Sequence, residues 1–365
     1  MAETTGIPGP GARATAPFCL FLFALVGCAI PANHAGTPRP VTTPASASPV
    51  WDVPPGPGQA PISQYVRRLA EDHRGAMWFG TNDEGAICFD GREFAQASAA
   101  TALAGHAVRG IVEDRFGVLW FATAVGLFAF DGAAWRRYTT ADGLPHDDLW
   151  SLCLLRDGEL WLGGIGGLCR FDGGRFTAVP LPPLAMAEAP RLTRQLVWAI
   201  AEDNDGEVWC GTDGGGLVRY NRDGSTLFTA GDGLVSDNVT ALLAARDGTL
   251  WIGAPRGGVT RFDGAKFTVV PELADLPAIV WTLFEDRDGD IWLGSAGDGL
   301  VRIRGTSPTR FGPGQGLGNR HVQSVLQTRD GRLWFGTSGG LYRLDGDRLQ
   351  EMTRPAGPSR ASGLP

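Results

Sequence analysis

The chain has 365 residues, 43% of them hydrophobic, enough for one large domain or two ordinary ones with a sizeable core. Its 53 glycines are spread along the sequence, which favours many tight turns over a helix-rich protein. The formal net charge of -7 disfavours nucleic acid as a partner, since phosphates need a basic face. Lys266 is the single lysine, which excludes a Walker-A phosphate site and most lysine-based covalent catalysis.

Residues 1–27 have the features of a signal peptide. A polar start is followed by an apolar run from Pro17 to Gly27, too short to cross a bilayer. The run ends in Leu25-Val26-Gly27-Cys28, which resembles the bacterial lipobox, where the cysteine is lipidated and becomes the first mature residue. The resemblance implies lipidation at Cys28 and, because Ala29 is not the aspartate associated with inner-membrane retention, an outer-membrane location. An ordinary signal peptide with an incidental cysteine is the alternative.

Residues 28–61 are expected to form a tether. They are rich in proline, alanine, serine and threonine with little apolar content, so they cannot bury a core. Together with a lipid on Cys28, such a tether would hold a soluble domain off a membrane surface. Membrane contact is therefore expected through the lipid anchor, with the domain facing the periplasm or the cell surface.

The next part of the chain, residues 62–354, repeats one unit seven times, and residues 355–365 are left as a tail. Each unit carries a tryptophan, an apolar residue and usually Gly-Thr, as in Trp78-Phe79-Gly80-Thr81. Successive copies lie 41, 42 or 48 residues apart, the longest spacing reflecting an insertion around residues 180–191. The repeat tryptophans are Trp78, Trp120, Trp161, Trp209, Trp251, Trp292 and Trp334.

Each unit reads as four short strands. A β-rich segment such as 280–285 is followed by a polar Asp-Gly turn, the tryptophan strand, a glycine-rich loop, a third strand and a short aromatic fourth strand. Four strands in about 42 residues is typical of a propeller blade. The sequence therefore predicts an all-β fold, a seven-bladed β-propeller of four-stranded antiparallel blades. Simple closure of the ring is expected, and a strand from Val50 to Val53 that joins the last blade stays open.

The segment from Ala201 to Tyr220 resembles the two-component regulator propeller repeat, as does Asp142-Gly143-Leu144-Pro145 before the third unit. The resemblance implies an extracytoplasmic ligand-sensing propeller, which in that family belongs to hybrid sensor kinases and is often duplicated to fourteen blades. Here seven units are present and no kinase, receiver or cyclase segment follows, so signalling is expected to need a partner protein. Gly363-Leu364-Pro365 copies the connector that introduces a further blade, so both a natural end and a truncated gene stay open.

Several motifs that suggest chemistry have a simpler structural interpretation. Residues 336–340 match the Gly-x-Ser-x-Gly pattern, but they occupy the same loop as residues 211–216 of another unit. The turns at 203–206 and 286–289 lack the other oxygen ligands of a calcium loop. We therefore expect no catalytic constellation, no metal and no cofactor. The repeat tryptophans are expected to pack between blades, and the strand cysteines to be core thiols: Cys88, Cys153, Cys169 and Cys210.

A binding site is expected where the innermost strands begin, beside the propeller axis. When these strands are aligned at their first valine or leucine, the following position varies and reads Arg67, Arg109, Trp150, Trp198, Thr240, Trp281 and Gln323. His106, His146 and His321 lie in the connectors just before three of the strands, on the same face. Arginines and aromatic rings together suit a sugar or acidic sugar through stacking and bidentate hydrogen bonds. The alternative is that the tryptophans only wedge between blades.

These observations favour a non-catalytic, membrane-anchored ligand-binding or sensory propeller. Its expected partners are a small molecule or glycan and a signalling protein, or it serves in glycan capture. Two other classes stay open, since fold alone does not choose among them. One is an enzyme of the streptogramin-lyase type, a propeller with a histidine and an acid near its axis. The other is a scaffold that binds partner proteins with the same faces.

Overall fold

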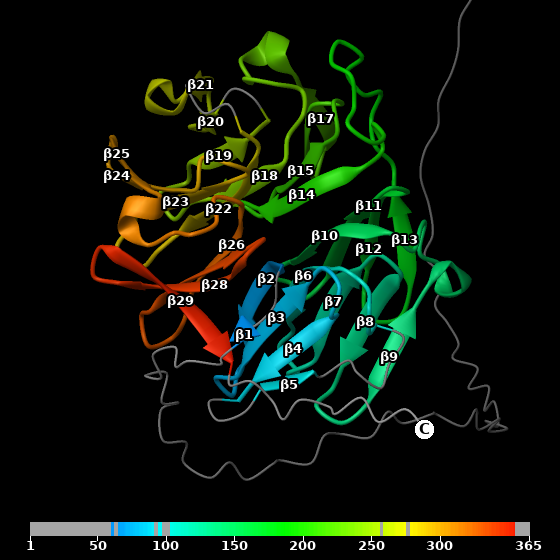
Figure 1. Cartoon of the computed structure of the whole chain (residues 1–365). Helices are drawn as coiled ribbons and strands as arrows, with labels where there is room; N and C mark the ends of the chain where they lie inside the picture. The colour runs from blue at the N-terminus through cyan, green and yellow to red at the C-terminus, as the bar shows by residue number, and fades with distance from the viewer. Residues whose placement is uncertain are drawn as a thin grey trace, which may run out of the picture. The chain divides into compact units, whose positions relative to one another are not determined.

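The computed structural model describes residues 60–61, 65–90, 94–96, 103–255, 258–274 and 278–354. Within these ranges the strands form seven antiparallel sheets around one axis, a seven-bladed β-propeller, which confirms the predicted fold class (Figure 1). Helical structure in the same ranges consists of short 3-10 turns: η1 (Thr140–Asp142), η2 (Ala230–Asp232), η3 (Pro271–Leu273) and η4 (Pro313–Gln315). The predicted signal peptide, Cys28, the segment Val50–Val53 and the tail 355–365 lie outside the described residues.

Each sheet follows the chain outward from the axis, and the innermost strands meet at the centre of Figure 1. The innermost strands are β2 (Val66–Glu71), β6 (Val108–Glu113), β10 (Leu149–Leu154), β14 (Val197–Glu202), β18 (Ala241–Ala244), β22 (Val280–Glu285) and β26 (Val322–Gln327). The second strands, which carry the repeat tryptophans, are β3 (Met77–Thr81), β7 (Leu119–Thr123), β11 (Leu160–Gly164), β15 (Val208–Thr212), β19 (Leu250–Gly253), β23 (Ile291–Ser295) and β27 (Leu333–Thr337).

The two outer strands of each sheet complete the blade. The third strands are β4 (Ala86–Phe89), β8 (Gly126–Phe130), β12 (Gly167–Phe171), β16 (Leu217–Asn221), β20 (Val259–Phe262), β24 (Leu300–Arg304) and β28 (Gly340–Asp345). The outermost strands are β5 (Phe94–Gln96), β9 (Trp135–Tyr138), β13 (Phe176–Val179), β17 (Gly224–Phe228), β21 (Phe267–Val269), β25 (Ser307–Phe311) and β29 (Arg348–Arg354).

The hydrophobic core lies between the blades. In the part of the chain that the structure describes, the buried apolar residues form seven clusters, each drawn from two neighbouring sheets. Trp78 packs edge-on against Phe121 of the next sheet, with ring centroids 5.6 Å apart, and Trp292 packs in a tilted arrangement against Phe335, with centroids 5.4 Å apart. Large rings that span two sheets supply much of this buried area. The prediction that the repeat tryptophans pack between blades is confirmed.

The Asp-Gly turns tie each tryptophan to its own hairpin. Asp203 accepts hydrogen bonds from the backbone N–H groups of Asp205 and Glu207 and from the indole of Trp209. Gly206 completes this turn at φ 81°, a conformation that glycine adopts at little cost. Asp286 bonds its turn and Trp292 in the same manner. Their oxygens are thus used within the hairpins, as the turn interpretation predicted.

Hydrogen bonds between neighbouring sheets run around the ring, and they also join the first blade to the last. The last residue of an innermost strand accepts a hydrogen bond from a backbone N–H of the preceding sheet's turn, as Gln327 does from Arg287 at 2.8 Å. Glu71 does the same for Arg329 at 2.7 Å, which joins the first sheet to the last. In addition β1 (Ala60–Pro61) pairs antiparallel with β29. The pairing segment therefore begins at residue 60, two residues before the expected start of the propeller.

Candidate functional site

The variable position of the innermost strands coincides with a repeated backbone irregularity. In six of the described sheets the register shifts between the first residue of this strand and the third, so one residue is left unpaired as a β-bulge. A bulge bends the strand and re-aims the unpaired side chain. The bulged residues are Arg67, Arg109, Trp150, Trp198, Trp281 and Gln323. In the fifth sheet β18 begins at Ala241, so Thr240 stands just ahead of it.

Side chains of the preceding blade satisfy carbonyls at the bulges. The Ser151 hydroxyl donates to the Val197 carbonyl at 2.9 Å, and Thr240 donates to Val280 at 2.6 Å. The Arg68 Nε donates to the Arg109 carbonyl at 2.6 Å. Because buried backbone groups rarely go unpaired, these bonds hold the bulged geometry in place. The bulges of β6, β14 and β22 are thus held by the preceding blade.

The bulged side chains converge at one mouth of the axial channel, as the alignment predicted. The pocket there is small, about 40 Å³. Its lining consists of Arg67, Arg68, Arg109, Trp150, Trp198, Thr240, Trp281 and Gln323. The mouth therefore combines cationic and aromatic side chains with two polar ones.

Three tryptophans form one cluster at the mouth. Trp150 meets Trp198 edge to face with ring centroids 4.7 Å apart, and Trp198 lies 5.9 Å from Trp281. Trp198 in the middle is 7% exposed, whereas the other two are half-buried. The rings thus pack against one another, while Trp150 and Trp281 still present surface.

Arginines flank the tryptophan cluster. The guanidinium carbon of Arg109 lies 3.8 Å from the ring centroid of Trp150, within the range of a cation–π contact. Arg109 also pairs with the Asp148 carboxylate and donates to the Leu149 carbonyl at 3.0 Å. Arg67 donates from its Nε to the Asn82 side chain at 2.8 Å, and burial lowers its pKa. Asp148 neutralises Arg109, but Arg67 and Arg68 keep the mouth positive.

Several hydrogen-bond donors at the mouth are buried without a partner. Among the described residues these include the indole Nε1 atoms of Trp150 and Trp198 and the Nε of Arg109. A buried donor that bonds to nothing loses its hydration without compensation, and such groups are rare in folded proteins. The mouth thus holds three N–H groups whose hydrogen-bonding capacity is unused by the described residues.

The insertion in the fourth unit contributes a residue that the sequence alignment missed. The guanidinium carbon of Arg191 lies 5.8 Å from the ring centroid of Trp198 and 5.6 Å from that of Trp281. The buried Asp213 carboxylate anchors this segment, accepting hydrogen bonds from the backbone N–H groups of Arg191, Leu192 and Thr193. The irregular 48-residue spacing was the available signal, but spacing does not show where a loop folds.

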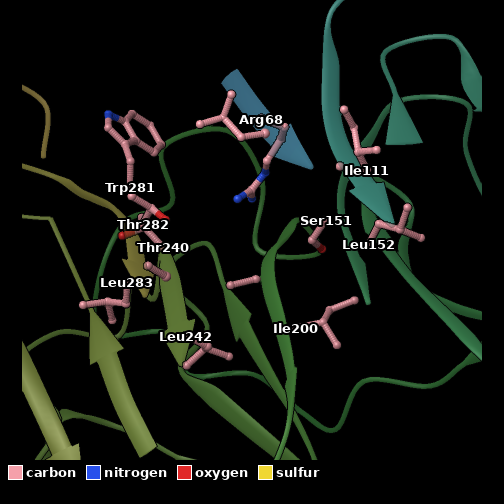
Figure 2. A pocket seen from close by; sticks show the side chains of 14 residues that line it. Arg68, Ile111, Ser151, Leu152, Ile200, Thr240, Leu242, Trp281, Thr282 and Leu283 are labelled. Atoms are coloured by element: carbon pink, nitrogen blue, oxygen red, sulfur yellow. The ribbon is translucent and has the colours of Figure 1, made fainter. Parts of the chain in front are cut away.

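A second cavity, of about 200 Å³, lies along the channel next to the mouth. Arg68, Thr240 and Trp281 line both spaces. Figure 2 shows the Arg68 guanidinium pointing into this cavity, between Thr282 on one side and Ser151 on the other. Leucines and isoleucines line its remaining part: Leu69, Ile111, Leu152, Ile200, Leu242 and Leu283.

The predicted histidines do not join the mouth. His106, His146 and His321 are exposed, and the residues that line the two axial spaces do not include them. His146 accepts a hydrogen bond at Nδ1 from the Asp148 backbone N–H, 2.9 Å away. The backbone N–H of His321 donates to the side-chain oxygen of Asn319. These contacts shape the connectors.

The cysteines of the strands are free thiols, which agrees with the core-thiol prediction. Cys169 and Cys210 are buried, and Cys88 and Cys153 are half-buried. Burial raises the pKa of Cys88 to about 12 and those of Cys153 and Cys169 to about 11. These values oppose formation of a reactive thiolate.

Two features are absent from the described part of the chain. It contains no group of three or more histidine, cysteine and acidic side chains that could hold a metal ion. It also contains no helix of the length and apolarity needed to span a membrane.

Comparison with known families agrees with the repeat. The sequence model of the two-component regulator propeller matches residues 61–83, 192–214, 233–256, 276–297 and 316–339. Each matched segment contains or borders an innermost strand and its tryptophan strand. No curated protein gives a significant match to the sequence. Five segments of the chain thus match the two-component regulator propeller repeat.

Several solved structures share the fold. The extracellular domain of a putative hybrid two-component system from B. thetaiotaomicron is 21% identical with a TM-score of 0.63, covering 76% of this chain and 39% of that one. A streptogramin B lyase is 14% identical with a TM-score of 0.63, covering 79% and 96%. PorZ, a surface component of the type-IX secretion system of Porphyromonas gingivalis, is 13% identical with a TM-score of 0.62, covering 80% and 48%. The chain spans about two fifths of the sensor domain's length.

Proposed function

We propose that this protein is an exported, non-catalytic propeller that binds a ligand at the channel mouth and acts as a sensory or capture module. The observation that carries the proposal is the set of bulged side chains gathered at one end of the axis. A core position repeated around a ring should be uniformly apolar, yet this one holds arginine, tryptophan, threonine and glutamine. Such a departure from packing rules is expected at functional sites.

The ligand class follows from the groups at the mouth. Half-buried indole rings offer apolar faces, the arginines offer positive charge, and the unpartnered N–H groups offer hydrogen bonds. Sugars present both C–H faces and oxygen acceptors, and acidic sugars add a carboxylate that suits a guanidinium. We therefore propose a glycan, and in particular an acidic one, as the ligand. The packing of Trp198 between its neighbours implies that the indoles shift when the ligand binds.

The sensory role is supported by the repeat family and by the likeness to an extracellular domain of a two-component system. In this proposal the chain passes the signal to a partner protein. A lyase activity like that of the streptogramin lyase is a second candidate, because that structure matches the fold equally well. The exposed positions of the three histidines speak for binding rather than for acid–base chemistry at the mouth. A scaffold role would use the same mouth for a protein partner.

The proposed location is the outer membrane, reached through lipidation at Cys28. A Cys28→Ser variant should then stay unprocessed or appear in the soluble fraction, while the parent labels with a radioactive fatty acid and sediments with membranes. Identical fractionation and migration of the two proteins would contradict the anchor without affecting the binding proposal.

The binding proposal is tested by thermal unfolding in the presence of neutral glycans, acidic glycans and peptides. A ligand that binds the folded state raises Tm in proportion to its concentration relative to Kd. We expect acidic glycans to give the largest shift. Ring opening of streptogramin B by elimination, with no water added to the product, would instead favour the lyase, and shifts confined to peptides would favour a scaffold.

A further inference from the structure

Arg68 is a large residue at a position that is occupied by small residues in the other six blades. It directly follows the bulge in β2, and the same position in the other innermost strands is occupied by Gly110, Ser151, Ala199, Ala241, Thr282 and Ser324. This position pairs with a glycine or alanine of the neighbouring tryptophan strand, as Ser151 pairs with Gly163 and Arg68 with Gly80. The first blade thus has a long cationic side chain at a position where the other blades have a small uncharged residue.

The charge of Arg68 has no carboxylate partner among the described residues. Its Nε donates to the Arg109 carbonyl, and its two terminal nitrogens have no hydrogen-bond partner in the part of the chain that the structure describes. Of the residues that line the cavity, Arg68 is the single charged one. Burial, followed by the neighbouring charge of Arg67, lowers the pKa of Arg68, yet a guanidinium stays protonated at neutral pH. A charge in such a place is costly unless an anion compensates it.

Thr282 supplies a second donor to the same space. A Cβ built on Gly294 would lie 2.7 Å from the Thr282 methyl, so the methyl fills the gap between the strands. The Thr282 hydroxyl lines the cavity and has no hydrogen-bond partner among the described residues. By contrast, Ser151 and Thr240 donate their hydroxyl protons to backbone carbonyls. The guanidinium and one hydroxyl are therefore free to donate to the same acceptor.

The volume limits what can bind. About 200 Å³ corresponds to roughly seven water molecules at about 30 Å³ each. A single oxyanion with a few waters fits this space, and a polymer does not. We propose that the axial cavity is a binding site for one small oxyanion, of the size of acetate, sulfate or phosphate, held by the terminal nitrogens of Arg68 and the Thr282 hydroxyl. The planar guanidinium fork matches the oxygens of all three.

The test is thermal unfolding with sodium acetate, sulfate or phosphate added to a buffer of bulky organic ions, and sodium chloride as the reference at equal ionic strength. Arg68→Ser removes the charge and should fold, because two other blades carry serine at this position. Thr282→Val keeps the methyl and removes the hydroxyl. Arg348→Ser, at an exposed site on β29, is the matched control for general salt effects.

We expect at least one oxyanion to raise the Tm of the parent and of Arg348→Ser in a saturable way beyond the effect of chloride. The Arg68→Ser variant should bind that anion at least tenfold more weakly, and Thr282→Val severalfold more weakly. The ranking of the three salts identifies the preferred anion. Superimposable responses of the parent and Arg68→Ser would overturn the proposal. Arg68 also lines the mouth, so the two sites are told apart by Thr282, which lines the axial cavity and is not among the residues that line the mouth. Thr282→Val should weaken anion binding and leave glycan binding at the mouth unchanged, and unaltered anion binding by Thr282→Val would contradict the axial site.

Discussion

The guanidinium of Arg109 lies over the ring of Trp150, with its central carbon 3.8 Å from the ring centroid. Both residues occupy the bulge of their strand, one blade apart. The contact therefore exists because two neighbouring bulges turn their side chains toward the same mouth. Arg109 also forms an ion pair with Asp148 and donates a hydrogen bond to the Leu149 carbonyl. One side chain thus links an aromatic ring, an acid and the backbone of the next blade.

Replacing Arg109 should weaken this junction. Arg109→Gln loses the ion pair with Asp148 and the contact with Trp150, so we expect the free energy of unfolding to fall by about 2 kcal/mol. Urea denaturation checks this, with Arg348→Gln as the exposed control. A loss equal to that of the control would show that the junction contributes little to stability.

The bond that joins the first and last blades gives a second prediction. Glu71→Ala removes the acceptor for the Arg329 backbone N–H, and should cost about 1 kcal/mol of unfolding free energy. Glu71→Gln should cost much less, because Gln327 accepts the equivalent bond from Arg287. If both variants unfold at the same urea concentration as the parent, the strand pairing of β1 with β29 is sufficient to close the ring.

The glycine of the tryptophan strand is explained by its neighbour across the blade boundary. A Cβ on Gly211 would lie 2.5 Å from the Val239 Cγ1 atom and 2.7 Å from its carbonyl oxygen. Gly211→Ala should therefore lower the free energy of unfolding by about 1–3 kcal/mol through overpacking. Gly312→Ala, where a Cβ meets nothing within 4 Å, serves as the control in the same thermal denaturation experiment. Equal effects of the two changes would contradict the packing explanation.

The buried thiols predict how stability responds to alkaline pH. Unfolded cysteines have a pKa near 8.5, whereas burial raises the pKa of Cys153 and Cys169 to about 11. The folded state thus retains protons that the unfolded state releases, so stability is unaffected below about pH 8.5 and falls as pH rises toward 11. Urea denaturation between pH 7 and 10.5 should show this fall, and it should be shallower in the Cys153→Ala, Cys169→Ala double variant. A native protein whose strand thiols react with Ellman's reagent at pH 8 as fast as the unfolded chain would contradict it.

Much of the fold could be predicted because the repeat encodes it. Six of the seven innermost strands begin at the predicted valine or leucine, and the exception, β18, starts two residues later, at Ala241 rather than Val239. The residues at the mouth could be aligned for the same reason, because each occupies the same position of its repeat. The site residues stay predictions until a ligand is found.

Features that break the repeat could not be predicted in this way. Arg191 reaches the tryptophans because its loop is anchored on Asp213, a contact between residues that no periodicity relates. Likewise the proposed anion site at Arg68 depends on the absence of an acid among the described residues around the cavity. The residues that line the cavity are known only from the three-dimensional structure. The pairing of β1 (Ala60–Pro61) with the last blade is a further contact that the repeat does not encode, and the possible strand at Val50–Val53 lies outside the described residues.

The most direct test of the binding site at the mouth is calorimetric titration with the glycan that gives the largest thermal shift. Trp281 is half-buried and lines both axial spaces, so Trp281→Ala should weaken binding at least tenfold while changing Tm little. Trp135, on the outer strand β9, is the matched control: Trp135→Ala should lose stability and keep the Kd of the parent. A Trp281→Ala protein that binds the glycan as tightly as the parent would contradict the account.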